Sequence, residues 1–391
     1  MTKRRTPFTV FFALIFLAAA AASGSAHQFP AGAEKLAKSE ECSGCHAAIY
    51  TEWTASMHAN SSPFKDNAHN AVRLKFAASL KQMGKTPSYH CANCHTPMAD
   101  NIADLMSGKA QPDSDNWTHT EGTGCSFCHR IESIVPGKEF NQYVLNKDGS
   151  FYSSNPSGKA PHKTAKSALF SSGEVCMGCH SHMRNSKGAP ICVMDEEGAS
   201  NCLTCHMPEA EGSPAAGSEK KTHFSHALPG GHDIDMLRKA VSLDMSVDTS
   251  AKPLKVAVTL KNISAHTFPS TMPMRLAFLK LTAEDSSGRV VWTNIKESPM
   301  EDMQSVLVKM FKAGEEKGVA PWKAEAVAMD TRLKKGEERK LSYTVPSDNI
   351  KTVSVSLIYR LFAPPAMKMM GIPADGKNDK VYMVIKKKVD L

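Results

Sequence analysis

Five short segments of the chain combine two cysteines and one histidine at the same spacing, C-x-x-C-H. Two thiols at this spacing can bond covalently to the vinyl groups of one haem, and the adjacent histidine can reach its iron. Ten of the 11 cysteines belong to these segments, and only Cys192 lies outside them. The segments are Cys42, Cys45 and His46; Cys91, Cys94 and His95; Cys125, Cys128 and His129; Cys176, Cys179 and His180; and Cys202, Cys205 and His206.

Other sites with paired cysteines explain this pattern less well. A zinc ribbon or a thiol redox pair does not require a histidine directly after the second cysteine. Histidine makes up 16 of 391 residues, yet it occupies that position in all five segments. Zinc remains an alternative for the last two segments, whose separation is near that of a zinc ribbon. We therefore predict five covalently bound haems c, held by the ten cysteines, with the five adjacent histidines as iron ligands.

The first 26 residues have the form of a secretory signal peptide. Lys3, Arg4 and Arg5 precede an apolar run from Val10 to Ala22, and the expected cut follows Ala26. The alternative is an uncleaved membrane anchor, although the apolar run is short for a bilayer span. Covalent haem attachment takes place outside the cytoplasm. Both features therefore predict a periplasmic protein, or one exported to the outer surface, with no membrane span after signal cleavage.

The remaining chain is long enough for two domains. The predicted pentahaem domain covers residues 27–235 and contains all the cysteines and 15 of the 16 histidines. It offers too few residues per haem for an ordinary protein core, so we expect the haems to form the core, surrounded by short helices and loops. Within this domain, 69–85 has the periodicity of a helix, and 209–222 is expected to be a flexible loop.

Residues 236–391 differ in character, because apolar and polar residues alternate there along several segments. This pattern is typical of half-buried strands and predicts an immunoglobulin-like β-sandwich of roughly seven strands. An amphipathic helix fits 301–311. The predicted fold class is therefore α+β, a haem-filled helical domain followed by an all-β domain. The expected strands are 254–263, 275–285, 289–294, 339–345, 351–361 and 380–388.

The two predicted domains also differ in charge. Residues 27–235 carry a net charge of −4, and residues 236–391 carry a net charge of +9. The basic domain could pack against the acidic one, or it could present a docking face to an acidic redox partner. Nucleic acid is not expected as a partner, because an exported haem protein does not meet it.

The second axial ligand of each iron decides what a multihaem protein can do. An iron with histidine on both sides passes electrons, whereas an iron with an open position can also bind a substrate. His182 follows a motif histidine by two residues and is a candidate ligand to a neighbouring haem. Cys192 is interpreted as a buried small residue, with a reactive thiol or an iron ligand as the alternatives. Two methionine-rich stretches are interpreted as loop packing.

The stretch ECSGCHAAIYTEWTASMHAN at 41–60 resembles the first haem segment of multihaem c-type cytochromes of the c-554 type, relatives of hydroxylamine oxidoreductase. THTEGTGCSFCH, SHALPGGHD and KNISAHTFPS resemble further segments of this family, although alanine replaces a glycine in the last. The resemblance covers the predicted haem domain well and the β-domain loosely, and it allows a reductase or oxidase that acts on a small nitrogen or sulfur species. The distal iron ligands that it implies are His58, His119, His226, His232 and His266.

Electron transfer through closely spaced, mostly bis-histidine haems is the function that the sequence favours. The donor would be membrane-linked or an enzyme, and the acceptor a periplasmic or extracellular redox partner. The alternative is an oxidoreductase in which one open haem acts on a small nitrogen or sulfur species such as nitrite, hydroxylamine or sulfite. The third class is a haem-bearing structural polymer or sensor. No side chain is assigned a catalytic role, and candidates for an open site are Tyr89, His90, Arg130 and Tyr152.

Overall fold

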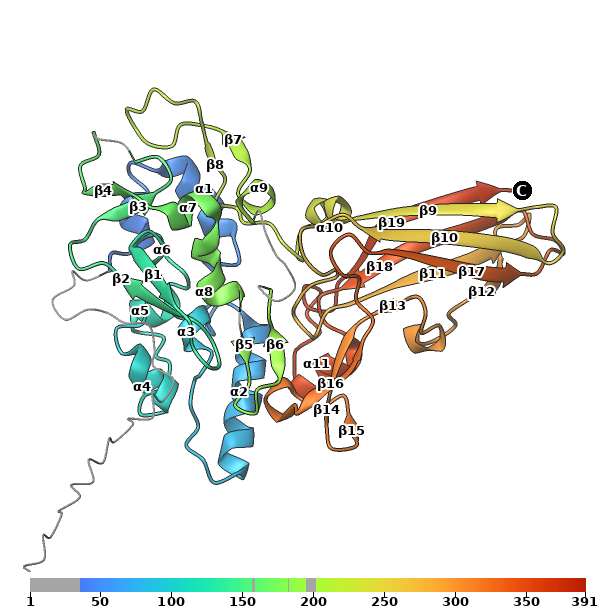
Figure 1. The fold of residues 1–391 in the computed structure, drawn as a ribbon, viewed down its shortest axis with the longest axis horizontal. Helices are drawn as coiled ribbons and strands as arrows, with labels where there is room; N and C mark the ends of the chain where they lie inside the picture. Colours follow the sequence, from blue (N-terminus) through green and yellow to red (C-terminus); the bar gives the residue numbers. More distant parts are fainter. Residues whose placement is uncertain (1–35, 157–158, 182, 195–201) are drawn as a thin grey trace, which may run out of the picture.

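A computed structural model of the protein describes residues 36–156, 159–181, 183–194 and 202–391. The predicted signal peptide and the candidate ligand His182 lie outside these ranges. Figure 1 shows an N-terminal part made of short helices and small sheets, beside a C-terminal part made mainly of long strands. Helices and strands thus occur together, as the α+β prediction required. No helix of the described residues combines the length and the apolar character needed to cross a membrane.

Short helices dominate the N-terminal part, and each C-x-x-C-H motif forms or borders one of them. The longest is α2, which begins after Asp66, whose carboxylate accepts a hydrogen bond from the backbone N–H of His69 at 3.0 Å. The predicted helix at 69–85 is therefore confirmed. The helices are η1 (Ser39–Cys42), α1 (Ala47–Ala55), α2 (Asn67–Gln82), α3 (Ala92–His95), α4 (Ile102–Ser107), α5 (Trp117–Thr120), α6 (Cys125–Cys128), α7 (Ala168–Ser172), η2 (Glu174–Cys176), α8 (Met177–His180) and α9 (Cys202–His206).

Four two-stranded sheets connect these helices. The parallel pair is β3 (Phe151–Ser153) with β4 (Thr164–Lys166). The antiparallel pairs are β1 (Ile131–Val135) with β2 (Gln142–Leu145), β5 (Met183–Arg184) with β6 (Pro190–Cys192), and β7 (Glu209–Glu211) with β8 (Thr222–Phe224). The expected loop at 209–222 therefore has a strand at each end, because β7 and β8 pair across it.

Two larger sheets form the C-terminal part, which begins with helix α10 (Ile234–Ala240). The predicted domain boundary at 235/236 falls inside this helix. The first sheet has the order β17-β10-β9, and the second has the order β12-β11-β18-β19 with β13 also paired to β11. The strands are β9 (Val241–Asp248), β10 (Leu254–Asn262), β11 (Leu276–Glu284), β12 (Val290–Thr293), β13 (Val306–Leu307), β17 (Glu338–Val345), β18 (Thr352–Arg360) and β19 (Val381–Asp390).

One apolar core joins these two sheets. Val256 and Val258 of β10 and Leu279 of β11 belong to the same cluster of buried side chains, to which α10 adds Leu237. Strand β10 alternates buried and more exposed residues along most of its length, as the sequence pattern predicted. All six expected strands are confirmed, whereas β9 was not predicted. The immunoglobulin-like arrangement of these strands stays a prediction.

The prediction of an amphipathic helix at 301–311 is wrong. Only the 3₁₀ turn η3 (Pro299–Glu301) is helical there, and the chain continues as β13 and β14 (Lys309–Ala313). The apolar residues whose spacing suggested a helix belong to two strands with different partners. Strand β13 pairs with β11, and β14 pairs with β16 (Ala326–Asp330). The remaining elements are β15 (Glu316–Lys317), η4 (Pro321–Lys323) and α11 (Pro364–Met370).

The two parts pack directly against each other, with α2 beside α11 in Figure 1. Met367 and Met370 of α11 are buried against Ala68 of α2, so this methionine-rich stretch serves packing, although it forms a helix and not the loop that the sequence interpretation expected. The Asn67 side chain donates a hydrogen bond to Asp375 at 2.8 Å across the same contact. The C-terminal part is therefore held in place beside the N-terminal part, which carries the C-x-x-C-H motifs.

Candidate haem-binding site

The cysteines and histidines of all five C-x-x-C-H motifs line one large cavity of about 2950 Å³. This is several times the roughly 300–1,000 Å³ of a pocket for one small molecule. Loops of the C-terminal part close one side of the cavity, since Phe268 and Arg275 are among its lining residues. A single space of this size can hold several large apolar groups close together.

One helical turn brings the three side chains of each motif together. The backbone N–H of His46 donates to the carbonyl of Cys42 at 2.9 Å, and His95 and His129 make the same contact with Cys91 and Cys125. Residues three and four apart lie on one face of a helix, so both thiols and the histidine point to the same side. This is the arrangement that covalent attachment of one haem per motif requires.

Four motif histidines each face a second histidine across the cavity. The ring centroids are 6.3 Å apart for His46 and His162, 5.9 Å for His58 and His180, 6.2 Å for His129 and His226, and 6.4 Å for His206 and His266. An imidazole nitrogen lies about 2 Å from a metal that it binds and its ring centroid about 1 Å further back, which gives about 6 Å between two rings on opposite sides of one ion. The described residues therefore fit iron atoms with two axial histidines.

Backbone carbonyls fix the orientation of several of these rings. The Nδ1 atom of His46 lies 2.7 Å from the carbonyl oxygen of Pro214, that of His129 2.7 Å from Tyr152, and that of His206 2.6 Å from Pro229. An N–H at Nδ1 that donates to a carbonyl leaves the lone pair of Nε2 for a metal. His226 and His266 have the same kind of Nδ1 contact, to the carbonyls of Phe224 and Thr267.

Burial favours the neutral form of five imidazoles that line the cavity, and the neutral form is the state that binds metal. Burial and then the neighbouring His180 lower the pKa of His58 to about 3. Burial and then His129 lower the pKa of His226 to about 4. Burial also lowers the pKa values of His95, His129 and His180. Each of these five rings therefore offers a lone pair instead of a positive charge at neutral pH.

A glycine holds the segment that carries His58. Gly122 has a φ of +84°, and a Cβ there would lie 2.4 Å from the carbonyl oxygen of His58. The next residue, Thr123, donates its backbone N–H to that same carbonyl at 2.9 Å. Trp53 also donates its indole N–H to the carbonyl of Thr123 at 2.9 Å. Gly122, shortly before the third motif, therefore helps to position His58, which faces His180 of the fourth motif.

His119 lies away from the cavity, in contrast to the other distal candidates of the described chain. It is buried, its Nδ1 accepts the backbone N–H of Asp113 at 3.0 Å, and its Nε2 lies 2.8 Å from Asn101 Oδ1. Both ring nitrogens are thus engaged with protein. His162 faces the first motif instead, and sequence reasoning missed it, because nothing distinguished it from the other histidines outside the motifs.

The second motif differs from the other four. The ring of His95 stacks on that of His69, with centroids 3.7 Å apart and planes 6° apart, too close to flank one iron. The Nε2 atom of His69 lies 2.8 Å from the Tyr89 hydroxyl, which lies 3.0 Å from Thr96 Oγ1. Within the described residues, no second histidine ring faces His95 at axial distance. His232 lines the same cavity. Burial lowers the pKa of both His232 and His95, and the carboxylate of Asp66 raises both pKa values, so both rings lie near Asp66.

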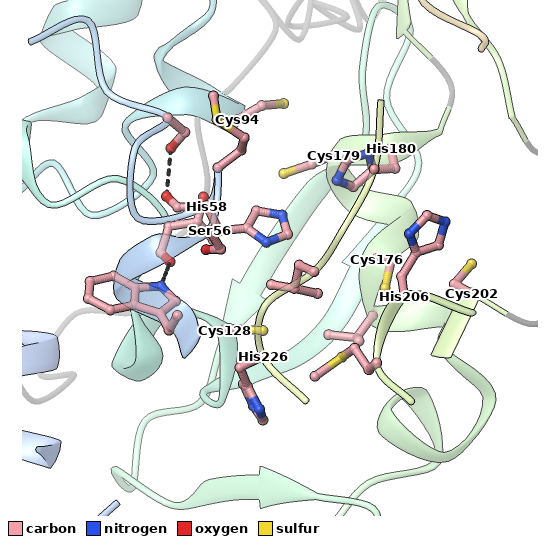
Figure 2. A pocket seen from close by; sticks show the side chains of 18 of the residues that line it. Ser56, His58, Cys94, Cys128, Cys176, Cys179, His180, Cys202, His206 and His226 are labelled. Carbon is pink, nitrogen blue, oxygen red and sulfur yellow. Dashed lines mark hydrogen bonds between the residues drawn. The ribbon is translucent and has the colours of Figure 1, made fainter. Parts of the chain in front are cut away.

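Contacts between cysteine side chains show which motifs are neighbours. Hydrogen bonding with Cys125 raises the pKa of the Cys42 thiol, so the first motif lies beside the third. The side chains of Cys94 and Cys179 hydrogen-bond, as do those of Cys176 and Cys202. The fourth motif therefore lies between the second and the fifth, and Figure 2 shows Cys179 on the side of Cys94 and Cys176 on the side of Cys202. Cys128 of the third motif also influences the pKa of both cysteines of the fourth.

The remaining candidates have other surroundings. Among the suggested open-site residues, His90 lies 3.5 Å from Glu139, and Arg130 is buried and donates to the backbone carbonyl of Asn146 at 2.8 Å. Cys192 is buried, and its Sγ atom lies 2.9 Å from Thr271 Oγ1 at the boundary between the two parts. Its burial agrees with the interpretation of a small buried residue.

Comparison with known proteins supports this site. Residues 41–130 match the family described as cytochrome c554 and c-prime. Among solved structures, the chain resembles a penta-heme cytochrome c552 from Thermochromatium tepidum, with a TM-score of 0.77 and 23% sequence identity. That match covers 91% of this chain and 99% of the other. No curated protein matches the chain. The family match thus covers the segment with the first three motifs, and the fold of nearly the whole chain is similar to that of a penta-heme cytochrome.

Proposed function

We propose that the protein is a periplasmic pentahaem cytochrome that carries electrons between a membrane-linked or enzyme donor and a periplasmic or extracellular acceptor. The observation that carries this proposal is the set of four histidine pairs at 5.9–6.4 Å. Each haem, when bound, takes up and releases one electron at its iron. Two thiols and the motif histidine would hold each haem, and at four of the five motifs a facing histidine would keep substrates from the iron.

The order of the motifs supports transfer through the protein. The thiol contacts join the first motif to the third and the fourth motif to both the second and the fifth. Cys45 and Cys205 of the first and fifth motifs are exposed, whereas cysteines of the middle motifs are less accessible. Electrons would therefore enter and leave at the outer motifs. Redox proteins are the partners that this arrangement would serve.

A second candidate function rests on the second motif. His95 stacks on His69 rather than facing another ring, and the Tyr89 hydroxyl supplies a proton donor near that stack. A haem at this motif with an open position would make the protein an oxidoreductase for nitrite, hydroxylamine or sulfite. His232 would close that position if it reaches the same iron.

Low-temperature EPR of the oxidised protein, with and without nitrite and hydroxylamine, separates the two functions. Electron transfer predicts that every ferric haem is low-spin and unchanged by either ligand. A high-spin signal that shifts on addition of nitrite would favour the oxidoreductase. A haem count by pyridine haemochrome that gives fewer than five per chain would contradict the pentahaem proposal.

A further inference from the structure

The carboxylate of Glu52 contacts the segment that carries His226, although 174 residues separate the two in the sequence. Glu52 lies on α1, and its Oε2 atom accepts the backbone N–H of His226 at 2.7 Å. Hydrogen bonds to an ionised acceptor are shorter and about twice as strong as those between neutral groups. A carboxylate is therefore well suited to hold this point of the backbone.

A buried histidine lies beside the same carboxylate. The Nε2 atom of His223 is 3.2 Å from Glu52 Oε2, and only 2% of the His223 side chain is exposed. Its Nδ1 atom lies 2.9 Å from the carbonyl oxygen of Gly212. A Cβ at Gly212 would lie 3.3 Å from the His223 ring, so this glycine gives the ring its room. The fixed ring of His223 limits where the Glu52 side chain can point.

The ring of His226 has a separate contact within its own segment. Its Nδ1 atom lies 2.8 Å from the carbonyl oxygen of Phe224, which leaves Nε2 for a metal. Its centroid lies 6.2 Å from that of His129 in the third motif. The contact with Phe224 is local and can fix the angle of the ring. The contact with Glu52 comes from another element, so it can fix the distance of the ring from His129.

Helix α1 holds Glu52 between the first and the third motif. The helix begins directly after His46. Trp53, the residue next to Glu52, is buried and donates its indole N–H to the carbonyl of Thr123 at 2.9 Å, two residues before Cys125. The helix is thus tied to one motif by the chain and to the next by a hydrogen bond. The position from which Glu52 reaches His226 is therefore fixed as well.

We propose that Glu52 is a positioning residue for His226, and that it holds the backbone of this histidine where the ring can serve as the distal iron ligand at the third motif. This inference rests on the proposed function, because it takes His226 as an iron ligand. Groups that orient a metal-ligating histidine commonly change metal affinity or activity by roughly tenfold to a hundredfold when they are removed. The geometry requires an acceptor at the reach of Glu52, and it does not require the negative charge.

Three variants of the haem-loaded protein separate the acceptor from its charge. Glu52→Ala removes the acceptor, so His226 should leave its iron in part of the molecules. Up to about one fifth of the ferric haem should then become high-spin in EPR, because one motif of five is affected. Glu52→Gln keeps an acceptor oxygen at the same reach and should retain the low-spin spectrum. Glu52→Asp keeps the charge but shortens the side chain, so it should also produce the high-spin signal, and it replaces Glu52→Ala if that variant does not fold.

Glu40→Ala is the matched control, because it removes an exposed carboxylate of η1 that does not line the cavity. His226→Ala gives the size of the full effect. The double variant Glu52→Ala/His226→Ala should equal His226→Ala alone, because Glu52 acts through this ring. A pyridine haemochrome count on each variant checks that the haems are still attached.

The proposal is overturned if Glu52→Ala and Glu52→Asp give the spectrum of Glu40→Ala while His226→Ala is high-spin. It is also overturned if Glu52→Gln is as high-spin as Glu52→Ala, since the charge and not the acceptor would then matter. A high-spin fraction in the double variant above that of His226→Ala would likewise contradict it. If His226→Ala itself stays low-spin, the axial pair of the third motif fails, and the role of Glu52 fails with it.

Discussion

Replacement of His162 by alanine tests the axial pairs most directly. His162 was not recognised in the sequence, yet its ring centroid lies 6.3 Å from that of His46. That separation is the one expected of two imidazoles on one iron. The substitution removes one of two axial nitrogens from the first motif and leaves its cysteines and His46 intact. We therefore expect that haem to remain attached but to become high-spin.

The size of the effect follows from the number of motifs. One motif of five is altered, so about one fifth of the ferric haem should move from low to high spin. Spin quantification by EPR and near-infrared magnetic circular dichroism measures this fraction. Free imidazole should restore the low-spin signal, because the deleted ring leaves a space of its own shape beside the iron.

His119→Gln is the control for this experiment. His119 is buried but does not line the cavity, and Asn101 and Asp113 hold its ring, so the variant should keep the wild-type spin state. The reasoning from ring separations is refuted if His162→Ala leaves every haem low-spin. It is also refuted if His119→Gln produces the high-spin signal instead.

Three further predictions concern the C-terminal part. His266→Ala should make the haem of the fifth motif high-spin, since His266 faces His206 at 6.4 Å, and unchanged visible and EPR spectra would contradict that pairing. Leu279→Ala should lower the free energy of unfolding by about 2–5 kcal/mol, because this side chain is fully buried between the two sheets; denaturant titration measures the loss, and a change below 1 kcal/mol would argue against a shared core. Gly231→Ala should cost about 1–3 kcal/mol through its clash with the Tyr359 hydroxyl, and adding Tyr359→Phe should recover most of that loss in thermal unfolding; an equal loss in both backgrounds would place the strain elsewhere.

The sequence predicted those features that depend on neighbouring residues alone. The C-x-x-C-H spacing needs only one helical turn to bring its side chains together, and the alternation along β10 needs only one buried face. The prediction of a helix at 301–311 failed because the apolar residues there are divided between β13 and β14, which pair with different strands. Which strand each of them pairs with depends on the tertiary structure, and this pairing produces no periodic pattern in the local sequence.

The distal histidines show the same limit. His58, His226 and His266 were expected from a resemblance, and the structure brings each to face a motif histidine. His119 was expected on the same ground, but its Nδ1 accepts the backbone N–H of Asp113 and its Nε2 donates to Asn101 Oδ1, so both nitrogens are occupied. His162 could not be chosen, because an axial pair joins residues that only the folded chain brings together.

The position of His266 has a consequence for how this chain can be divided. It lies on the loop between β10 and β11, and its backbone carbonyl accepts a hydrogen bond from Asn262 at 2.8 Å. A fragment ending near residue 235 would keep every cysteine but would lose the wall that carries this ring. The strand-rich part is therefore not a detachable module. The fifth motif therefore gains its facing histidine only when residues about 60 positions beyond it have folded into place.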